Sequence, residues 1–478
     1  MTHTVIAGAS IAGLATALAL AATGHRVTVL DRADAPPPPP ADPGREGTWF
    51  TRRPTVPQGG HSHTLTSLGV RTLAHRAPHV LAAARTAGAH LLDLTDALPP
   101  DATDTAREMG DDDLTALACR RPTLEHVLHQ AALATPGITL RHATTVAALD
   151  LDDSGRIQAV RTSDHTRLAA DAVVDATGRR AASRTWLAQA GIPLAADHTC
   201  PSGLTGHTRF YRLLAGQRPG PLGRGNAAGD IFDHYAGVLH PGDGDTFSIA
   251  LATLPGDRAL AGLNTPEGFT AAARATPGLT VWLESGISEP ISPVHAITAP
   301  PNTLRGNATT RQKPIPGLFP VADAACITNP LFGRGMSLAL AHAYALADLL
   351  AAHDPTATTT ARLAARLAED LYTPWYTHAA HADRLRIARW RAAVTATEPP
   401  PPTDTDRLQA KIALAARTDG TVWRGLTRML MTLATPAEIL DDKFLTRIQH
   451  APTAQPRPAG PTRADLVRLV TAAEGAAR

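Results

Sequence analysis

The chain has 478 residues, of which 44% are hydrophobic and 18% charged, so it is long enough for roughly two or three domains and has the composition of a soluble enzyme. Its formal net charge of +2 at pH 7 gives no reason to expect a nucleic acid or another strongly anionic partner. The three cysteines, an odd number without a C-x-x-C pair, argue against a disulfide framework and favour a reducing, cytoplasmic compartment.

The N-terminal stretch predicts a strand, a turn, a helix and a second strand. Residues 4–7 form a short β-branched run typical of a buried strand, and Ile11–Ala22 is rich in Ala and Leu, with Gly24 ending the helix. Residues 27–30 form the second predicted strand, which Asp31 follows directly. Since no basic region precedes the first strand, we expect no signal peptide.

The turn in this unit carries an imperfect dinucleotide-binding fingerprint. Gly8 and Gly13 stand at the outer positions of G-x-G-x-x-G, and Ser10 replaces the middle glycine. Gly8 permits the tight turn, Gly13 lets helix and strand pack closely, and the helix N-terminus offers N–H groups to a pyrophosphate. Asp31 is placed to accept hydrogen bonds from a ribose diol. The unit therefore predicts a dinucleotide site, the alternative being an ordinary helical crossover in which Asp31 is a solvated strand end.

A loop is predicted over residues 33–57, which hold a run of prolines and the basic residues Arg45, Arg52 and Arg53. This loop is either a solvated insertion or a mobile segment near the cofactor, because long loops in compact domains are often functional.

Two glycines and two histidines follow within residues 58–63, ahead of a helical stretch predicted over residues 67–92. The glycines allow the backbone to approach a ligand closely, and His61 and His63 share a face on an extended chain. We expect no metal there, because no further ligands are nearby.

The middle of the chain alternates short strands with turns. A helix is predicted to start at Pro122 or Thr123, directly after Arg120 and Arg121. Strands are predicted at residues 138–141, 145–149, 157–161 and 172–175, the last of which ends in a turn of small residues at 176–179.

Residues 186–301 predict an antiparallel sheet that carries a pocket wall, since strand-like runs alternate there with Gly, Pro and Asp turns. Aromatic residues make up only 4% of the chain, so their clustering in this region favours an apolar substrate pocket, with a packed core as the alternative. The aromatic residues in question are Phe210, Tyr211, Phe232, Tyr235, Phe247 and Trp282.

A strand-like stretch at 317–323 is followed by a turn rich in Pro and Gly and by a helix from about residue 336 to 352. His342 and Asp348 interrupt that helix, and no run of about 18 apolar residues occurs, so we expect a core helix rather than a membrane span. Further helices are predicted over residues 359–396 and again after a proline-rich linker, where Trp423, Leu426, Met429, Leu430 and Leu433 form a stripe that we expect to be core.

Taken together, the N-terminal fingerprint, the Asp-Ala-Thr-Gly turn at 175–178 and the strand that ends in Asp323 resemble the FAD-dependent monooxygenases of the single-component aromatic-hydroxylase superfamily. Within it the chain is similar to bacterial natural-product tailoring enzymes, the polyether-epoxidase-like branch, and more distantly to squalene monooxygenase. Residues 58–63, 121–125 and 460–466 carry that closer resemblance. The resemblance covers nearly the whole chain, although residues 186–301 match only in pattern.

The resemblance implies an α/β fold in which a Rossmann-type FAD-binding domain is interleaved with an antiparallel-sheet substrate domain and followed by C-terminal helices. The FAD-binding domain would comprise residues 1–185, with the loop insertion 33–57, and residues 305–355. The substrate-binding antiparallel sheet would take residues 186–304. The C-terminal helical region would span residues 356–478 and contain a Pro-rich linker at 398–406.

By the same resemblance the chain binds FAD without a covalent bond. Asp31 would bind the adenosine ribose, Arg121 would lie along the pyrophosphate and ribityl chain, and Asp323 would hold the ribityl hydroxyls. Val146 would touch the adenine through its backbone. Ala322 stands where the family usually has glycine. The implied cofactor-binding residues are Gly8, Ala9, Ser10, Ile11, Ala12, Gly13, Asp31, Arg32, Arg121, Val146, Asp323, Pro330, Gly333, Arg334, Gly335 and Met336, and the candidates to face the flavin or the substrate are His61, His63, Asn329 and Phe332.

The helix that follows Gly333 would contribute to the chemistry through its first N–H groups. Such groups stabilise negative charge, so at the flavin pyrimidine edge they would favour the anionic reduced flavin.

The implied activity is insertion of one oxygen atom, by epoxidation or hydroxylation, into a hydrophobic natural-product intermediate through a flavin C4a-hydroperoxide. Molecular oxygen is the co-substrate, and no catalytic acid or base is assigned. Reduction would come from NADPH or NADH docking transiently on the loop with Arg45, Arg52 and Arg53, or from a partner flavin reductase. The alternative is an FAD-dependent reductase of a prenyl-type alkene. A halogenase is disfavoured, because the chain has no lysine before Lys313.

Overall fold

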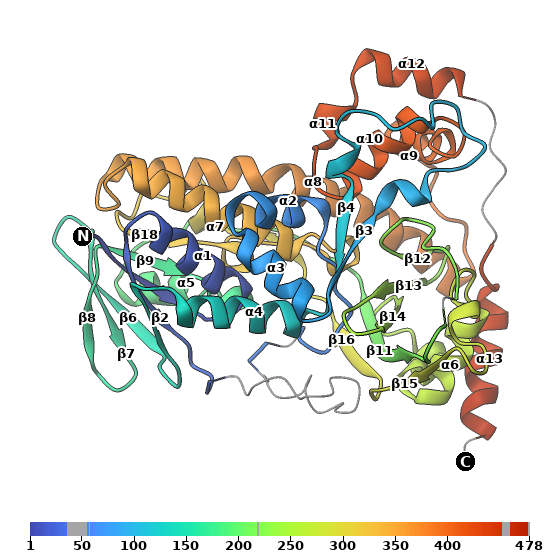
Figure 1. Ribbon diagram of the computed structural model, residues 1–478, viewed down its shortest axis with the longest axis horizontal. Helices are drawn as coiled ribbons and strands as arrows, with labels where there is room; N and C mark the ends of the chain where they lie inside the picture. The colour runs from blue at the N-terminus through green and yellow to red at the C-terminus, as the bar shows by residue number, and fades with distance from the viewer. Residues whose placement is uncertain (36–54, 57, 218, 452–458, 477–478) are drawn as a thin grey trace.

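The computed structural model describes residues 1–35, 55–56, 58–217, 219–451 and 459–476, and Figure 1 shows their arrangement. The loop arginines Arg45, Arg52 and Arg53 lie outside the described residues. A five-stranded sheet has the order β18-β9-β1-β2-β5, with parallel pairing throughout. Its strands are β1 (His3–Ala7), β2 (Arg26–Leu30), β5 (Ile138–Arg141), β9 (Ala172–Asp175) and β18 (Leu318–Pro320).

The predicted N-terminal unit is confirmed: β1 leads into α1 (Ile11–Ala22), which returns to β2. Side chains of the parallel sheet alternate between two clusters, because successive strand residues point to opposite faces. Ile6 and Val174 pack with α1, α4 and α7, whereas Val5 and Val173 pack with α5 and a three-stranded sheet. The sheet is therefore buried on both faces. The covering elements are α4 (Arg121–Ala134), α5 (Ala182–Gln189), α7 (Gly335–Ala352), β6 (Val146–Leu151), β7 (Ile157–Thr162) and β8 (Arg167–Ala169).

A second, antiparallel sheet occupies the right-hand side of Figure 1. Its strand order is β12-β13-β14-β11-β15, and β16 also pairs with β11. The strands are β11 (Thr205–Leu213), β12 (Ala228–Ile231), β13 (Ala236–Pro241), β14 (Thr246–Thr253), β15 (Ser288–Pro290) and β16 (His295–Thr298). The predicted antiparallel sheet is thus present.

The aromatic residues of this sheet form packed core. Tyr211 stacks on Phe247, and Trp282 meets Phe247 edge-on, each pair with 5.2 Å between ring centroids. Together with Tyr235 they share a buried cluster with α6 (Pro266–Ala275) and α13 (Arg463–Ala476). For these four residues, the packed core is the interpretation that the structure supports.

Helix α7 contacts α1, α2 (Ser67–Arg76) and α8 (Thr358–Thr395). By length and composition it is the one helix in the described ranges that could cross a membrane, but 61% of it is buried inside the protein, as in a core helix. Helix α8 runs for 38 residues without a break, although Pro374 lies inside it. A small sheet of β10 (His198–Cys200), β17 (Asn302–Leu304) and β19 (Cys326–Ile327) lies near these helices, since β17 and β19 both contact α8.

The helices α9 to α12 gather at the upper right of Figure 1, beside β3 and β4, whereas α13 lies lower, beside α6. Trp423, Leu426, Leu430 and Leu433 belong to one hydrophobic cluster there, so the predicted core stripe is confirmed for these residues, whereas Met429 packs with another cluster. The elements are β3 (His90–Asp93), β4 (Thr115–Ala118), α9 (Asp404–Ala415), α10 (Gly420–Leu430), α11 (Pro436–Ile439) and α12 (Asp442–His450).

Three predicted boundaries are wrong. The stretch 67–92 is not helical throughout: α2 and α3 (Pro78–Thr86) are followed by β3, which pairs with β4. Helix α4 begins at Arg121, so this arginine lies in the first turn and not ahead of the helix. Helix α9 begins at Asp404, inside the predicted linker, because Thr403 and Asp406 form a capping box.

A buried ion pair connects the parallel-sheet unit with the antiparallel sheet. Arg120 precedes α4, and Asp243 lies between β13 and β14; their Nη2 and Oδ2 atoms are 2.6 Å apart, with side chains 3% and 2% exposed. Asp243 also accepts hydrogen bonds from the Arg120 backbone N–H at 2.7 Å and from the Thr123 hydroxyl at 2.9 Å. The carboxylate is therefore well satisfied, as a buried charge must be.

We predict that Asp243→Ala lowers the free energy of unfolding by about 3–5 kcal/mol, because it leaves the buried Arg120 cation without its carboxylate. Urea denaturation followed by circular dichroism measures the change. The matched control is Asp348→Ala, which removes an ion pair with Arg76 whose side chains are 39% and 55% exposed and should cost about 1 kcal/mol or less. Equal losses in the two variants would contradict the role given to the buried pair.

Candidate functional site

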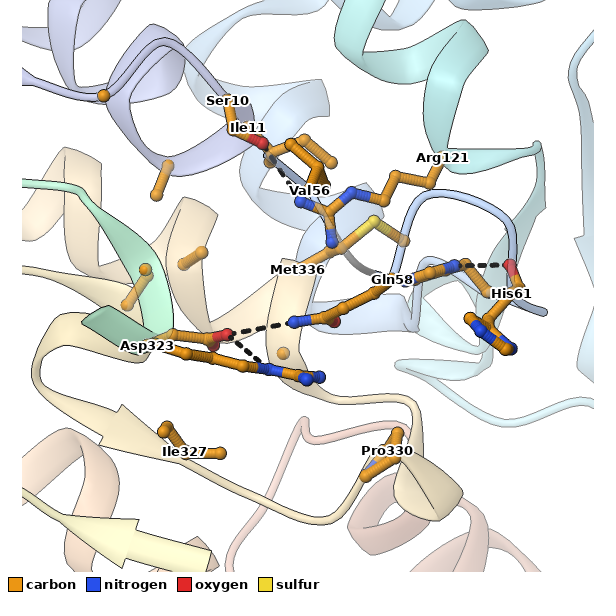
Figure 2. Close-up of a pocket in the computed structure, with 18 of the residues that line it drawn as sticks. Ser10, Ile11, Val56, Gln58, His61, Arg121, Asp323, Ile327, Pro330 and Met336 are labelled. Atoms are coloured by element: carbon orange, nitrogen blue, oxygen red, sulfur yellow. Dashed lines mark hydrogen bonds and ion pairs between the residues drawn. The ribbon is translucent and has the colours of Figure 1, made fainter. Parts of the chain in front are cut away.

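One cavity is lined by residues from widely separated parts of the chain (Figure 2). Ser10 and Arg121 lie on one side of it, Asp323 and Ile327 lie on the other, and Gln58 reaches between them. Its lining comprises residues 8–12, 31–32, 55–56, 58, 61–64, 121, 176–180, 240, 297, 299, 322–323, 327–330, 333–336 and 339.

The turn from β1 into α1 depends on two glycines. Gly8 has φ +110°, and a Cβ there would lie 2.4 Å from the carbonyl oxygen of Ala176. A Cβ on Gly13 would lie 1.8 Å from the carbonyl oxygen of Gly8. No side chain fits at either position, so the close crossing of β1, α1 and the turn after β9 requires glycine.

Ser10, at the place of the middle glycine, is tied to helix α4. Its hydroxyl donates to Oε2 of Glu125 at 2.9 Å and accepts from Nη2 of Arg121 at 3.0 Å. Ser10 is the N-cap of α1, but its side chain makes no capping hydrogen bond. The first N–H groups of α1 therefore open toward the cavity without a side-chain cap.

Asp31 closes the same turn from the end of β2. Its Oδ2 accepts from the Ala9 N–H at 2.7 Å, and its Oδ1 accepts from the Ala33 N–H at 2.8 Å. The side chain is buried and lines the cavity. A carboxylate accepts hydrogen bonds from hydroxyl groups, which is the chemistry that a ribose partner requires.

Asp323 lies on the opposite side, with its side chain 29% exposed. Gln58 Nε2 donates to its Oδ2 at 3.2 Å, and Arg179 Nε lies 3.8 Å from the same oxygen (Figure 2). Burial lowers the pKa of Arg179, and the nearby carboxylate of Asp323 opposes that shift. Gln58, Arg179 and Asp323 thus form one polar group at this end of the cavity.

Ala322, the residue before Asp323, has the left-handed backbone conformation, with φ 53°. Its N–H donates to the hydroxyl of Tyr372 at 3.1 Å, and that hydroxyl also lies 3.0 Å from Nδ1 of His342. The alanine at a position where glycine was expected is therefore accommodated, but in a conformation that an L-residue adopts at a cost.

A buried polar network shapes the segment that leads to α7. The amide of Asn329 donates to Oδ1 of Asp383 at 2.7 Å, and its Oδ1 accepts from the Leu331 N–H at 2.9 Å. Asp383 also accepts from Asn302 Nδ2 at 2.7 Å and from Arg386 Nη2 at 2.9 Å, while burial raises its pKa. Because its polar atoms are used in this way, Asn329 holds the segment in place.

Arg334 is the most deeply buried cation of the site, at 1% exposure. Its guanidinium lies 4.8 Å from the ring centroid of Phe332 and 4.6 Å from that of Trp375, and its Nη1 is 3.1 Å from Nδ1 of His378. Within the described ranges its Nε and Nη2 have no hydrogen-bond partner. Burial lowers its pKa to about 9. The site therefore holds a cation poorly compensated by the protein itself.

Three cavity histidines are held neutral at physiological pH. Burial lowers the pKa of His61 and of His240 to about 4 and that of His63 to about 3. No group of three or more His, Cys, Asp or Glu side chains in the described ranges could hold a metal ion.

The structure brings most of the predicted site residues together. Gly13, Val146 and Phe332 are the exceptions, since they do not line the cavity. Gly13 packs against the backbone of Gly8, Val146 packs in the cluster beneath the parallel sheet, and Phe332 contacts Arg334 and His378. The predicted residues that do line it are Gly8, Ala9, Ser10, Ile11, Ala12, Asp31, Arg32, His61, His63, Arg121, Asp323, Asn329, Pro330, Gly333, Arg334, Gly335 and Met336.

Sequence reasoning missed Gln58, Arg179 and His240 as cavity residues. Gln58 and Arg179 stand inside motifs that had been singled out, so their neighbours were a usable signal. The signal for His240 was weaker. The apolar residue before it, Leu239, lies in the core, and successive strand residues point to opposite faces, so His240 points away from that core.

Comparison with known proteins places the fold. No protein-family model matches the chain. Protein Rv3254 of Mycobacterium tuberculosis is 28% identical over 422 residues, which cover 81% of this chain and 83% of that protein.

Solved structures of similar fold include PqsL, a probable FAD-dependent monooxygenase from Pseudomonas aeruginosa, with a TM-score of 0.57, 18% identity and coverage of 83% of this chain and 100% of that one. The p-nitrophenol 4-monooxygenase PnpA from Pseudomonas putida has a TM-score of 0.58, 18% identity and coverage of 91% and 100%. The flavin-dependent brominase Bmp2 has a TM-score of 0.56, 12% identity and coverage of 94% and 98%. The chain therefore has the mixed α/β fold that FAD-dependent monooxygenases and flavin-dependent halogenases share.

We predict that Ala322→Gly leaves the stability unchanged or raises the free energy of unfolding by up to about 1 kcal/mol, because glycine relieves the left-handed backbone at a modest entropic cost. The control is Ala324→Gly in the same short turn, where φ is not positive and glycine should cost at least about 0.5–1 kcal/mol. Chemical denaturation of both variants gives the comparison. A loss for Ala322→Gly as large as that of the control would refute the strain assigned to residue 322.

Proposed function

We propose that this chain is an FAD-dependent monooxygenase that inserts one oxygen atom into a hydrophobic small molecule. The observation that carries the proposal is the single cavity shared by the start of α1, the start of α7, Asp31 and Asp323. A dinucleotide cofactor has negative charge at its pyrophosphate and hydroxyl donors at its ribose and ribityl chain, and this lining offers a partner for each. The shared fold of FAD-dependent monooxygenases supports the proposal.

The residues present fit FAD on their own geometry. Gly8 and Gly13 allow the close backbone crossing at the start of α1, Ser10 makes no side-chain capping hydrogen bond there, and a Cβ on Gly335 at the start of α7 would meet nothing within 4 Å. The cofactor therefore has open backbone N–H groups at both helix starts. In this proposal the domains are interleaved as the sequence implies, with residues 1–185 and 305–355 around FAD and 186–304 around the substrate.

We assign the polar ends of the cavity as follows. Asp31 holds the adenosine ribose, Arg121 lies along the pyrophosphate, and Asp323 holds the ribityl hydroxyls. Reduced FAD supplies the activation of molecular oxygen. The chain's own residues bind and orient the cofactor, and the helix start at Gly335, with the buried Arg334 beside it, favours negative charge on the bound ring.

The substrate of this proposal is a natural-product intermediate with an electron-rich alkene or ring, oxidised by epoxidation or hydroxylation. An electrophilic oxidant needs no strong protein base, which agrees with the neutral histidines of the cavity. An FAD-dependent reductase of a prenyl-type alkene is the second candidate, because the same cavity would serve it. The fold is also found in a flavin-dependent brominase, but the first lysine of this chain is Lys313, so we do not favour halogenation.

The reductant is NADPH or NADH, or a partner flavin reductase. The sequence holds one strand-turn-helix fingerprint, which this proposal commits to FAD, so a nicotinamide cofactor would dock only transiently. The three cysteines are free, which agrees with the reducing, cytoplasmic compartment that we propose.

We predict that the protein purifies with one FAD per chain, released by acid precipitation, and that Asp323→Ala weakens FAD binding by about 10–100-fold. Loss of charge-assisted hydrogen bonds from the ribityl hydroxyls costs about 1.5–3 kcal/mol. Equilibrium dialysis measures the affinity. Asp348→Ala, an acidic residue of α7 that does not line the cavity, is the control and should bind FAD like the parent protein. Unchanged affinity in Asp323→Ala would count against the assigned cofactor site.

We predict one labelled oxygen atom in the product when FAD-loaded protein turns over under heavy molecular oxygen. Mass spectrometry of the product distinguishes the two candidate functions, because a reductase would add two hydrogens and no label. Candidate substrates are products of neighbouring biosynthetic genes. Unlabelled, hydrogenated product would replace the monooxygenase proposal with the reductase.

A further inference from the structure

Two histidines from different parts of the fold each present to the cavity a ring nitrogen that accepts hydrogen bonds. His63 lies in the segment before α2, and His240 lies on β13 of the antiparallel sheet. Nδ1 of His63 is 2.8 Å from the carbonyl oxygen of His61, and Nδ1 of His240 is 3.1 Å from the carbonyl oxygen of Asn226. A carbonyl oxygen only accepts hydrogen bonds, so Nδ1 carries the proton in both rings. In a neutral ring, Nε2 is then an acceptor.

The surroundings keep both rings neutral. Burial, together with the nearby Arg121 cation, lowers the pKa of His63 to about 3, and burial lowers that of His240 to about 4, with Arg224 acting in the same direction. The charged side chains that act on these rings are thus cationic. At neutral pH the two rings accept hydrogen bonds and do not take up a proton.

The neighbouring polar side chains are already paired with one another. Nδ1 of His61 is 3.1 Å from the hydroxyl of Thr208, and the hydroxyls of Ser62 and Ser248 are 2.8 Å apart. By contrast, Nε2 of His63 and of His240 has no hydrogen-bond partner among the residues that the structure describes. Polar atoms that line a binding cavity and lack protein partners are the ones left for a ligand.

His240 belongs to the sheet that the proposed function assigns to the substrate. It shares the cavity-side surface with Thr208 and Ser248, opposite the aromatic core that contains Leu239 and Phe247. The proposed cofactor residues Asp31 and Ser10 follow strands β2 and β1 of the parallel sheet. A ligand group that reaches His240 is therefore assigned to the substrate.

We propose that His63 and His240 form an acceptor-only subsite that holds the polar end of the substrate through hydroxyl or N–H donors. This inference rests on the proposed function and adds the polarity of the substrate to it. The subsite selects molecules that donate hydrogen bonds at this end, such as a hydroxylated ring or an enol. It disfavours ethers, which have no hydrogen-bond donor. It also disfavours carboxylates, because their oxygens are acceptors and would face the acceptor nitrogens of the two histidines. Both histidines are specificity residues and neither is a base.

The test compares matched ligands on the FAD-loaded protein. The probes are hydroxyl compounds paired with their methyl ethers at one, two and three rings, including 1-naphthol with 1-methoxynaphthalene, and 1-naphthoate as the carboxylate. Perturbation of the flavin absorbance gives each dissociation constant. We expect at least one hydroxyl compound to bind 10-fold or more tightly than its ether and than the carboxylate of the same ring system.

The variants assign that preference to the histidines. His240→Leu and His63→Leu should each reduce the preference to within about 3-fold, whereas His240→Gln, whose amide oxygen still accepts, should keep most of it. His234→Leu is the matched control, because His234 precedes β13, contacts Tyr235 and does not line the cavity. It should keep the full preference.

The inference is overturned if no hydroxyl compound in the panel binds more tightly than its ether in the parent protein. This test uses the parent protein alone, so it remains decisive even if a leucine variant fails to fold. It is also overturned if His240→Leu keeps the preference. Failure of the proposed function looks different, because it would appear as absent FAD or as product without labelled oxygen.

Discussion

The structure depends on the close crossing of backbone at the start of α1. Gly8 and Gly13 bring β1, α1 and the turn after β9 within a distance that excludes any Cβ, and Asp31 fixes the turn from the neighbouring strand through the N–H of Ala9. This crossing puts the helix start at the carboxyl edge of the parallel sheet, where ligands of such sheets bind. The rest of the cavity lining comes from other parts of the chain, including the segment before α2, the turn after β9 and the start of α7.

The opposite wall is positioned by buried polar contacts. Asp383 gathers Asn302, Asn329 and Arg386, and through Asn329 it sets the segment that enters α7. Each of these hydrogen bonds lies in a water-poor interior, where an unpaired partner is costly, so the segment has few alternative conformations. The cavity is thus held between a wall made rigid by backbone packing and a wall made rigid by hydrogen bonds.

The electrostatics of the cavity follow from burial more than from charge. Burial lowers the pKa of its histidines into the range of about 3 to 4, and it leaves Arg334 as a cation without a carboxylate among its described contacts. The neutral acceptors His63 and His240 and the buried cation Arg334 beside the start of α7 divide the cavity into two chemically distinct parts. That division agrees with the proposed anionic cofactor at one end and the proposed donor-bearing substrate at the other.

The sequence alone determined the N-terminal unit, because Gly8, Gly13 and Asp31 act through local backbone geometry over a short stretch. It also placed most of the cavity residues near α1 and α7, since those motifs are contiguous. What it left open were the contacts between distant segments. Whether the aromatic residues of the antiparallel sheet line a pocket or form core was decided by α6 and α13 packing on their face. The tautomer of His240, and the pairing of Gln58 and Arg179 with Asp323, arise from partners in other segments of the chain, which local sequence does not encode. Only the tertiary structure brings those groups within hydrogen-bond range and removes water from around them.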